Sequence, residues 1–172
     1  MSVALSADSK LVVSGSDNST IKIWDAATGR EIQTLEGHYD SVASVAFSAD
    51  SKLVVSGSGD STIKIWDAAT GREIQTLEGH RDWVTSVAFS ADSKLVVSGS
   101  GDSTIKIWGL ATGQEMRTPA IGTTLRNISF DITGAHLNTD IGVVRMLGGY
   151  DGVGSSDGFF YRLPDWADRL PD

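Results

Sequence analysis

Cysteine is absent from the 172-residue sequence, and no long apolar run occurs in it. Without cysteine the chain can form neither a disulfide framework nor a thiolate metal site. No apolar stretch approaches the ~20 residues that a membrane-spanning helix needs. The first ten residues, MSVALSADSK, lack the basic and apolar segments of a secretory signal. We therefore expect a cytoplasmic protein with no membrane partner.

Positive charge is scarce, because the chain has 14 Lys and Arg but 22 Asp and Glu. Its formal net charge is -8. A chain this acidic repels a polyanion, which argues against nucleic acid as a general partner. The phosphate-binding motif GxxxxGK(S/T) and the EF-hand spacing of calcium loops are also missing. The sequence thus predicts no cofactor and no metal site.

A repeat of 42 residues organises most of the chain. The segment SADSKLVVSG begins at residues 6, 48 and 90, and the segment STIKIW ends at residues 24, 66 and 108. A fourth, worn copy, LRNISFDITGAHLNTD, follows at residues 125–140 with one residue deleted. Such self-similarity at a fixed period is the signature of a repeat architecture.

Within one repeat, four short segments rich in Val, Ile, Phe and Thr alternate with Asp, Ser and Gly turns, which is the pattern of β-strands. No segment has the apolar period of a helix. Four strands per repeat are typical of one blade of a β-propeller. In the second copy the expected strands cover residues 42–48, 53–58, 62–66 and 73–78.

We therefore expect an all-β fold, a partial propeller of about four four-stranded antiparallel blades in an open arc, with the first and fourth blades degenerate. The repeat array would occupy residues 1–147, and residues 148–172 would form an acidic Gly/Asp-rich C-terminal segment. The expected blades cover residues 2–40, 41–82, 83–123, and 124–147 together with 158–163.

The unit VASVAFSADSKLVVSGSGDSTIKIWDAATGREIQTLEGH, with Trp-Asp after the third strand and Gly-His after the fourth, resembles the WD40 repeat family over residues 2–118 and, in worn form, 124–146. The near-identity of the copies and the closing ISFDITGAHLNTDIG resemble, more narrowly, the arrays of fungal NLR-type proteins, among them the vegetative-incompatibility proteins. Those proteins carry a NACHT module ahead of the array. The resemblance implies a non-catalytic protein-binding module at the recognition or scaffold end of such a protein.

The resemblance also implies a hydrogen-bonded set of His, Ser, Asp and Trp in each complete blade, which ties the loop between blades to a turn. A Ser-His-Asp hydrolase is the alternative, but a set that recurs once per structural unit favours packing over catalysis. We therefore expect no enzyme activity. The first copy has Asn18 in place of the Asp, and the fourth lacks both Trp and His, so these blades should be looser. The expected sets are His38, Ser56, Asp60 and Trp66, and His80, Ser98, Asp102 and Trp108.

Residues 19–58 and 61–100 differ at three positions only, and these positions alternate along the chain. In an extended strand such residues point to one side. We interpret them as a row of recognition residues that faces proteins or peptides, and Tyr, Trp and Arg are enriched at binding hot spots. The alternatives are drift on a solvated edge and packing of Trp83 against a neighbouring blade. The row consists of Tyr39, Ser41 and Ala43 in one copy and Arg81, Trp83 and Thr85 in the next.

An arc of four blades leaves two apolar faces without a neighbour, which is costly for a domain of this size. Three interpretations follow: the chain is part of a longer WD40 protein, it forms a homodimer, or it docks on another propeller. For the function, the alternatives are a general WD40 adaptor, for example in organelle division or ubiquitin-ligase complexes, and a truncated non-functional fragment.

Overall fold

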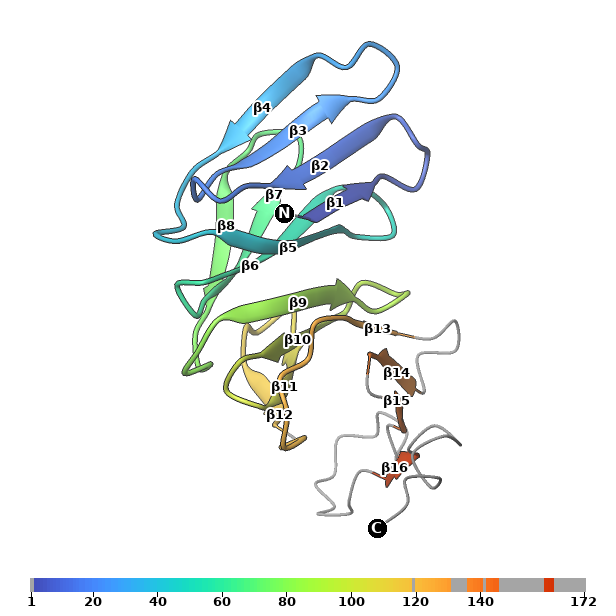
Figure 1. Cartoon of the computed structure of the whole chain (residues 1–172). Coiled ribbons are helices and arrows are strands. Elements are labelled where there is room, and N and C mark those ends of the chain that lie inside the picture. Colours follow the sequence, from blue (N-terminus) through green and yellow to red (C-terminus); the bar gives the residue numbers. More distant parts are fainter. Residues whose placement is uncertain (1, 119, 131–135, 141, 146–159, 163–172) are drawn as a thin grey trace, which may run out of the picture.

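The computed structural model describes residues 2–118, 120–130, 136–140, 142–145 and 160–162, and there it confirms the expected all-β fold. Its strands form four antiparallel sheets, or blades, of four strands each in chain order (Figure 1). The expected segment 148–172 lies outside the described residues except for β16, which pairs with β15. The strands are β1 Ser2–Leu5, β2 Leu11–Gly15, β3 Ile21–Asp25, β4 Glu31–Leu35, β5 Val42–Phe47, β6 Leu53–Ser58, β7 Ile63–Asp67, β8 Glu73–Leu77, β9 Val84–Phe89, β10 Leu95–Ser100, β11 Ile105–Gly109, β12 Glu115–Arg117, β13 Ile128–Phe130, β14 His136–Thr139, β15 Gly142–Arg145 and β16 Phe160–Arg162.

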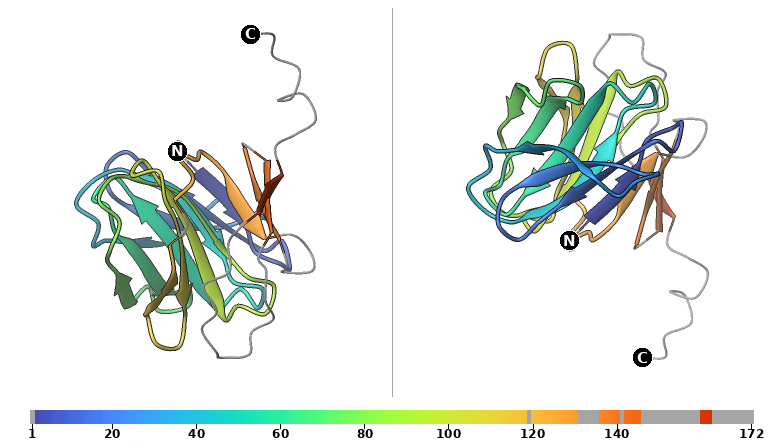
Figure 2. Two further views of the ribbon diagram at one scale, coloured as in Figure 1. Left: turned by 90° about the horizontal axis from the view of Figure 1, so that it is seen from below. Right: turned by 90° about the horizontal axis from the view of Figure 1, so that it is seen from above.

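The blades follow one another face to face, and the first strand of each contacts the first strand of the next. Figure 2 looks along this stack from its two ends and shows successive blades turned relative to one another, as in a fan. The first and fourth blades are the ends of an open arc (Figure 1). The part of the chain that the structure describes has no helix long and apolar enough to cross a membrane.

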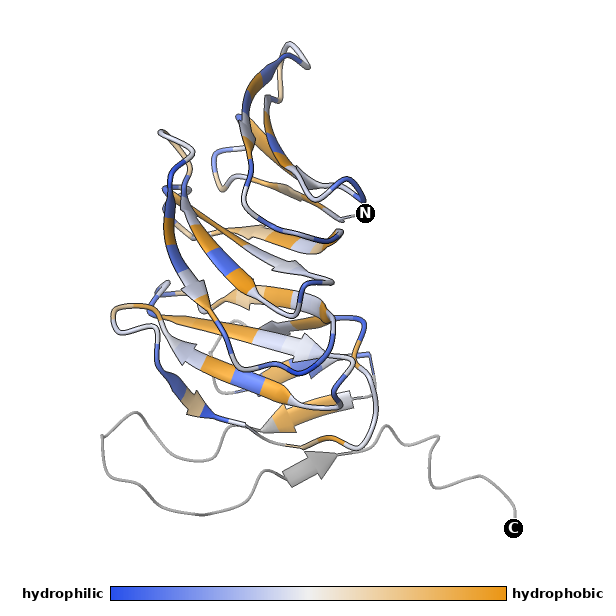
Figure 3. Ribbon diagram, turned by 90° about the vertical axis from the view of Figure 1, so that its left-hand side faces the viewer, coloured by the Kyte–Doolittle hydropathy of each residue, from blue (hydrophilic) through white to orange (hydrophobic). Residues whose placement is uncertain are grey.

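The hydrophobic core lies between the blades, because each strand sends alternate side chains to opposite faces of its sheet. In β6, Val54 packs toward the first blade and Val55 toward the third. Three clusters result, one for each pair of adjacent blades. Figure 3 shows the apolar residues along the strands and the hydrophilic ones mainly at the connections. Each blade is therefore stabilised mainly by its neighbours.

Hydrogen bonds from one blade to the next repeat with the sequence. In each case a backbone N–H of one first strand donates to a serine Oγ on the first strand of the preceding blade. The three bonds run from Val45 N to Ser2 (3.2 Å), from Val87 N to Ser44 (3.1 Å) and from Ile128 N to Ser86 (3.0 Å).

Among the described residues, nothing covers one face of the first blade. Val3 is 65% exposed, whereas Val45, its counterpart in the second blade, is 5% exposed. Leu5 on the same strand is 59% exposed. Trp24 is half-buried, although the matching tryptophans of the second and third blades are 1% exposed. The same residue types are thus buried where a neighbouring blade covers them and exposed where none does.

Candidate functional site

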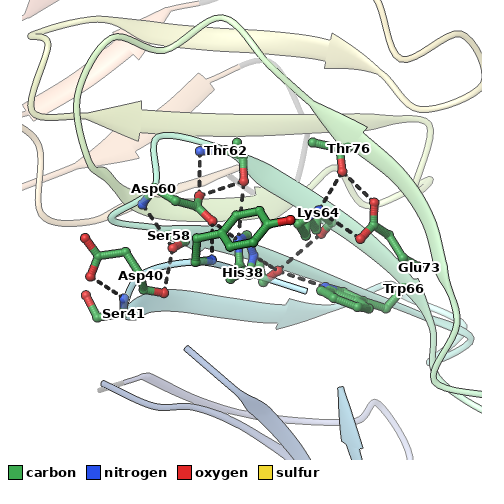
Figure 4. A network of polar contacts seen from close by, with 12 residues as sticks. His38, Asp40, Ser41, Ser58, Asp60, Thr62, Lys64, Trp66, Glu73 and Thr76 are labelled. Atoms are coloured by element: carbon green, nitrogen blue, oxygen red, sulfur yellow. Dashed lines mark hydrogen bonds and ion pairs between the residues drawn. The ribbon is translucent and has the colours of Figure 1, made fainter. Parts of the chain in front are cut away.

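In the second blade, His38 lies in the β4–β5 connection and joins two strands and a turn (Figure 4). Its Nδ1 lies 2.8 Å from Asp60 Oδ2, and its Nε2 lies 2.8 Å from Ser56 Oγ. Trp66 Nε1 donates to the same Ser56 Oγ at 2.8 Å. We call these four residues the second-blade tetrad. The third-blade tetrad, with corresponding distances of 2.9, 2.8 and 2.9 Å, consists of His80, Asp102, Ser98 and Trp108.

A neutral histidine protonated at Nδ1 satisfies the hydrogen bonds of the tetrad. Because the Trp66 N–H donates to Ser56 Oγ, the single Ser56 hydroxyl proton is free to donate to His38 Nε2. The Nδ1–H of a neutral imidazole then donates to Asp60. Burial lowers the pKa of His38 from its usual value and outweighs the opposing effect of Asp60. The pKa of His80 is lowered for the same reason.

Asp60 gathers several donors around one carboxylate. Besides His38, it accepts bonds from the Thr62 hydroxyl at 2.7 Å, the Thr62 amide at 2.9 Å and the Tyr39 amide at 2.9 Å. Burial alone would raise the pKa of Asp60, but the bonds from Thr62, Tyr39 and His38 lower it to about 2. The pKa of Asp102 is lowered in the same way. Both carboxylates are therefore ionised at neutral pH.

The order Ser–His–Asp in each tetrad has the connectivity of a hydrolase triad, but its environment does not suit catalysis. Ser56 is fully buried, and His38 is 7% exposed. The Ser56 hydroxyl is also bound to Trp66. A nucleophile must reach its substrate, and neither Ser56 nor the equally buried Ser98 meets solvent. The tetrads act as clamps between strands and loops.

A second polar group, which no motif in the sequence indicated, lies beside the second-blade tetrad (Figure 4), and its counterpart in the third blade consists of Lys106, Glu115 and Thr118. Lys64 is 8% exposed, and its Nζ donates to Glu73 Oε2 and Thr76 Oγ1, both at 2.8 Å. Strand register could have indicated it, because Lys64 pairs with Thr76 and Trp66 with Glu73 across β7 and β8. This group ties the outer strand to the tetrad strand, so it supports the clamp.

The first and fourth blades contain only parts of this arrangement. In the first, Trp24 Nε1 still donates to Ser14 Oγ at 2.9 Å, and Asn18 Oδ1 accepts from Thr20. In the fourth, Asp140 accepts a hydrogen bond from the backbone of the β12–β13 connection. Its Oδ1 lies 3.2 Å from Arg126 N. Asp140 thus resembles Asp60 in binding a loop amide. No motif in the sequence indicated this role.

The backbone of the β4–β5 connection is fixed by residues of the second blade. The Tyr39 amide donates to Asp60, and the Asp40 carbonyl accepts from Ser58 Oγ at 2.9 Å. The Ser41 carbonyl accepts from a turn amide at 2.9 Å. The β8–β9 connection is fixed by the same bonds through Asp102, Ser100 and Gly101. Both connections therefore hold their side chains on a rigid backbone.

Three of the six predicted recognition residues project into solvent from these connections. Tyr39 is 92% exposed, Trp83 is 62% exposed, and Arg81 is exposed. Within the described residues none of the three side chains makes a hydrogen bond, an ion pair or a ring contact. Ser41 lies beside them and is half-buried. Trp83 does not pack into the neighbouring blade.

Ala43 and Thr85 lie differently, because a β-bulge interrupts the alternation at both positions. Each is half-buried. The Thr85 hydroxyl donates to the carbonyls of Gly99 and Leu125, the second of which precedes the fourth blade. The six residues are thus not one uniform row, and residue 85 contacts the next blade.

The histidines predict a pH dependence of stability. Folding lowers the pKa of His38 and His80, so the unfolded chain binds more protons below about pH 6.5. The free energy of unfolding should therefore fall as the pH drops from about 7 to about 5, before the carboxylates titrate. Urea denaturation at several pH values measures this slope. A flat or rising stability over that range would contradict the neutral tetrad.

Comparison with known proteins agrees with this geometry. A family model described as WD domain, G-beta repeat matches residues 1–25, 29–67 and 71–109, which is more than half of the chain. The two longer matches each span the outer strand of one blade and the first three strands of the next. No curated protein matches the chain. The repeat, the four-stranded blades and the family match lead to one conclusion: the chain belongs to the WD40 repeat family.

Proposed function

We propose that the chain is a non-catalytic interaction module that binds a protein or peptide through Tyr39, Arg81 and Trp83. WD40 repeats generally serve as protein-interaction scaffolds, which supports the general class. One observation carries the specific site. The positions at which two otherwise identical copies differ include three exposed side chains that make no hydrogen bond, ion pair or ring contact within the described residues, on a backbone that the tetrads hold.

A rigid backbone with exposed aromatic and arginine side chains suits recognition for two reasons. A few residues contribute most of the binding energy in protein interfaces, and Tyr, Trp and Arg are enriched among them. A pre-organised loop also loses little conformational entropy when it binds a partner. Ala43 and Thr85, which lie closer to the blade, would set the position of these side chains.

The experiment is a selection of binders from a displayed random-peptide library against the purified chain. Each selected peptide is then tested on the double variant Arg81→Tyr/Trp83→Ser. This variant gives the third-blade loop the residues that the second-blade loop already has at these positions, so the fold should be preserved. We expect the affinity of the peptides to fall at least about tenfold, as for loss of hot-spot residues.

The matched control is Lys52→Ser/Lys94→Ser, in turns at the other end of the blades. It should leave peptide affinity unchanged. Equal binding to Arg81→Tyr/Trp83→Ser and to the unaltered chain would contradict the proposed site. Circular dichroism of both variants shows whether the blades are intact.

We propose, more specifically, that this module is the recognition end of a cytoplasmic fungal NLR-like protein. The near-identity of the copies and the segment at residues 128–142 support it. A NACHT phosphate-binding motif upstream in the same reading frame would be the decisive observation. Its absence would favour a general WD40 adaptor, and a frame interrupted by stop codons would favour a fragment.

The exposed face of the first blade supports a further part of the proposal, that another blade covers it. This blade would come from a second copy or from a longer chain. Light scattering on a sizing column measures the native mass of the 172-residue chain. A discrete dimer would support the second copy, and a monomer would assign the covering blade to a longer chain.

A further inference from the structure

The charges of the chain are divided unequally between the two ends of its blades. We define the tetrad end by the connections and turns that meet there: residues 16–20, 36–41, 59–62, 78–83 and 101–104. Strand register places these segments together, since Val42 pairs with Ser58 and Ile63 with Leu77. In these segments the tetrad end carries one cation and seven carboxylates, and the corresponding segments of the fourth blade add one of each, Arg126 and Asp140. The cation is Arg81, and the carboxylates are Asp17, Glu36, Asp40, Asp60, Glu78, Asp82 and Asp102.

Most of these carboxylates have no cation beside them. Asp60 and Asp102 contact the tetrad histidines, whose pKa is lowered by burial. The other five are exposed, and within the described residues none forms an ion pair. Their charges therefore add to a negative potential over the same surface that presents Tyr39 and Trp83.

The opposite end of the same blades is different. Its turns carry five Asp, three Lys and two Arg, so their charges balance. Three of these Asp lie beside a Lys, in Asp8–Lys10 at 3.7 Å, Asp50–Lys52 at 3.8 Å and Asp92–Lys94 at 3.7 Å. The negative charge of the array is thus concentrated at the tetrad end and is not a general feature of its surface.

We infer that the partner of the tetrad end is a basic protein segment, rich in lysine and arginine, that lies across the exposed aromatic side chains. This inference rests on the proposed function and names the chemistry of its partner. Positive side chains are attracted by the five exposed carboxylates, which speeds encounter and selects against acidic partners. Tyr39 and Trp83 offer ring faces that bind lysine and arginine by cation–π contact.

The same charge argument excludes other occupants. Nucleic acid would be repelled. The C-terminal segment 148–172 carries five Asp and two Arg, so this end repels it as well. The tetrad ends of two copies would repel each other in the same way.

The test uses the peptides selected from the random library. We expect them to carry a net positive charge relative to the unselected library. The variant Asp17→Asn/Glu36→Gln/Glu78→Gln removes three exposed charges whose side chains make no hydrogen bond or ion pair within the described residues. It should weaken binding about five- to tenfold at about 0.05 M salt. The effect should nearly vanish at about 0.5 M salt, where charges are screened. The control Asp8→Asn/Asp50→Asn, at the opposite end, should bind as the unaltered chain does.

The outcomes separate this inference from the function on which it rests. Basic peptides that lose affinity in both the Arg81→Tyr/Trp83→Ser variant and the charge variant support both. Neutral or acidic peptides that depend on Arg81 and Trp83 would overturn the charge inference and leave the proposed function in place. Peptides that bind without regard to Arg81 and Trp83 would overturn the proposed function and the inference with it.

Discussion

Replacing Trp66 with alanine is expected to lower the free energy of unfolding by about 3–5 kcal/mol. The side chain is 1% exposed and packs between the first and second blades, against Gly37 and Ile23 among others. The substitution leaves a large cavity at this interface and removes the donor to Ser56. Because the free energy of unfolding of a domain is typically only about 5–15 kcal/mol, the loss is a large fraction of the total.

The chain contains its own control for this substitution. Trp24 occupies the same place in the first blade and donates to Ser14 in the same way, but it is only half-buried, because no blade covers it within the described residues. Trp24→Ala should therefore cost about 2 kcal/mol less than Trp66→Ala. Urea denaturation followed by circular dichroism measures both. Equal losses would mean that the tryptophan stabilises its own blade and not the interface.

Gly57→Ala should be the second severe substitution. A Cβ at Gly57 would lie 2.5 Å from Val84 Cγ1 and 2.9 Å from Val87 Cγ1. Both valines are buried between the second and third blades, and a β-branched side chain cannot rotate away without a new clash. We expect the free energy of unfolding to fall by about 3 kcal/mol, as for an overpacked core.

Gly99, at the same position one repeat later, provides the comparison. A Cβ there would lie 3.2 Å from Leu125 Cβ and 3.6 Å from its Cδ1, so small shifts suffice. Gly99→Ala should cost less than about 1 kcal/mol. The two variants are compared by thermal and urea denaturation. If Gly99→Ala proves as destabilising as Gly57→Ala, the third and fourth blades pack more tightly than these distances indicate.

The fold could be predicted from the sequence because the 42-residue repeat sets both the number of strands and their order. The expected strands of the second copy agree with β5 to β8 within one or two residues. The turns were less predictable. Ser51 and Ser61 adopt positive φ angles of 59° and 68°, which non-glycine residues seldom do. The Ser51 hydroxyl accepts a bond from Ala7 of the first blade, a contact that depends on how blades are placed.

The site was predictable in its residues but not in its geometry. The resemblance of the repeats indicated His38, Asp60 and their partners. Strand alternation suggested that residues 39, 41 and 43 share one side, but the bulge at residue 43 changes the direction of the strand. A bulge depends on the register between two strands, and the alternation within one strand carries no information on it.

The serine bonds between blades all run in one direction along the chain, from an amide to the serine of the preceding blade. Each of the three near-identical units therefore has one donating and one accepting side, and its two sides fit either of the other two. Unequal recombination between copies, which adds or removes one unit, leaves every remaining unit with matching neighbours. The number of repeats in the array can thus change in evolution without compensating substitutions. The segments around residues 39–41 and 81–83 can then change their order along the array.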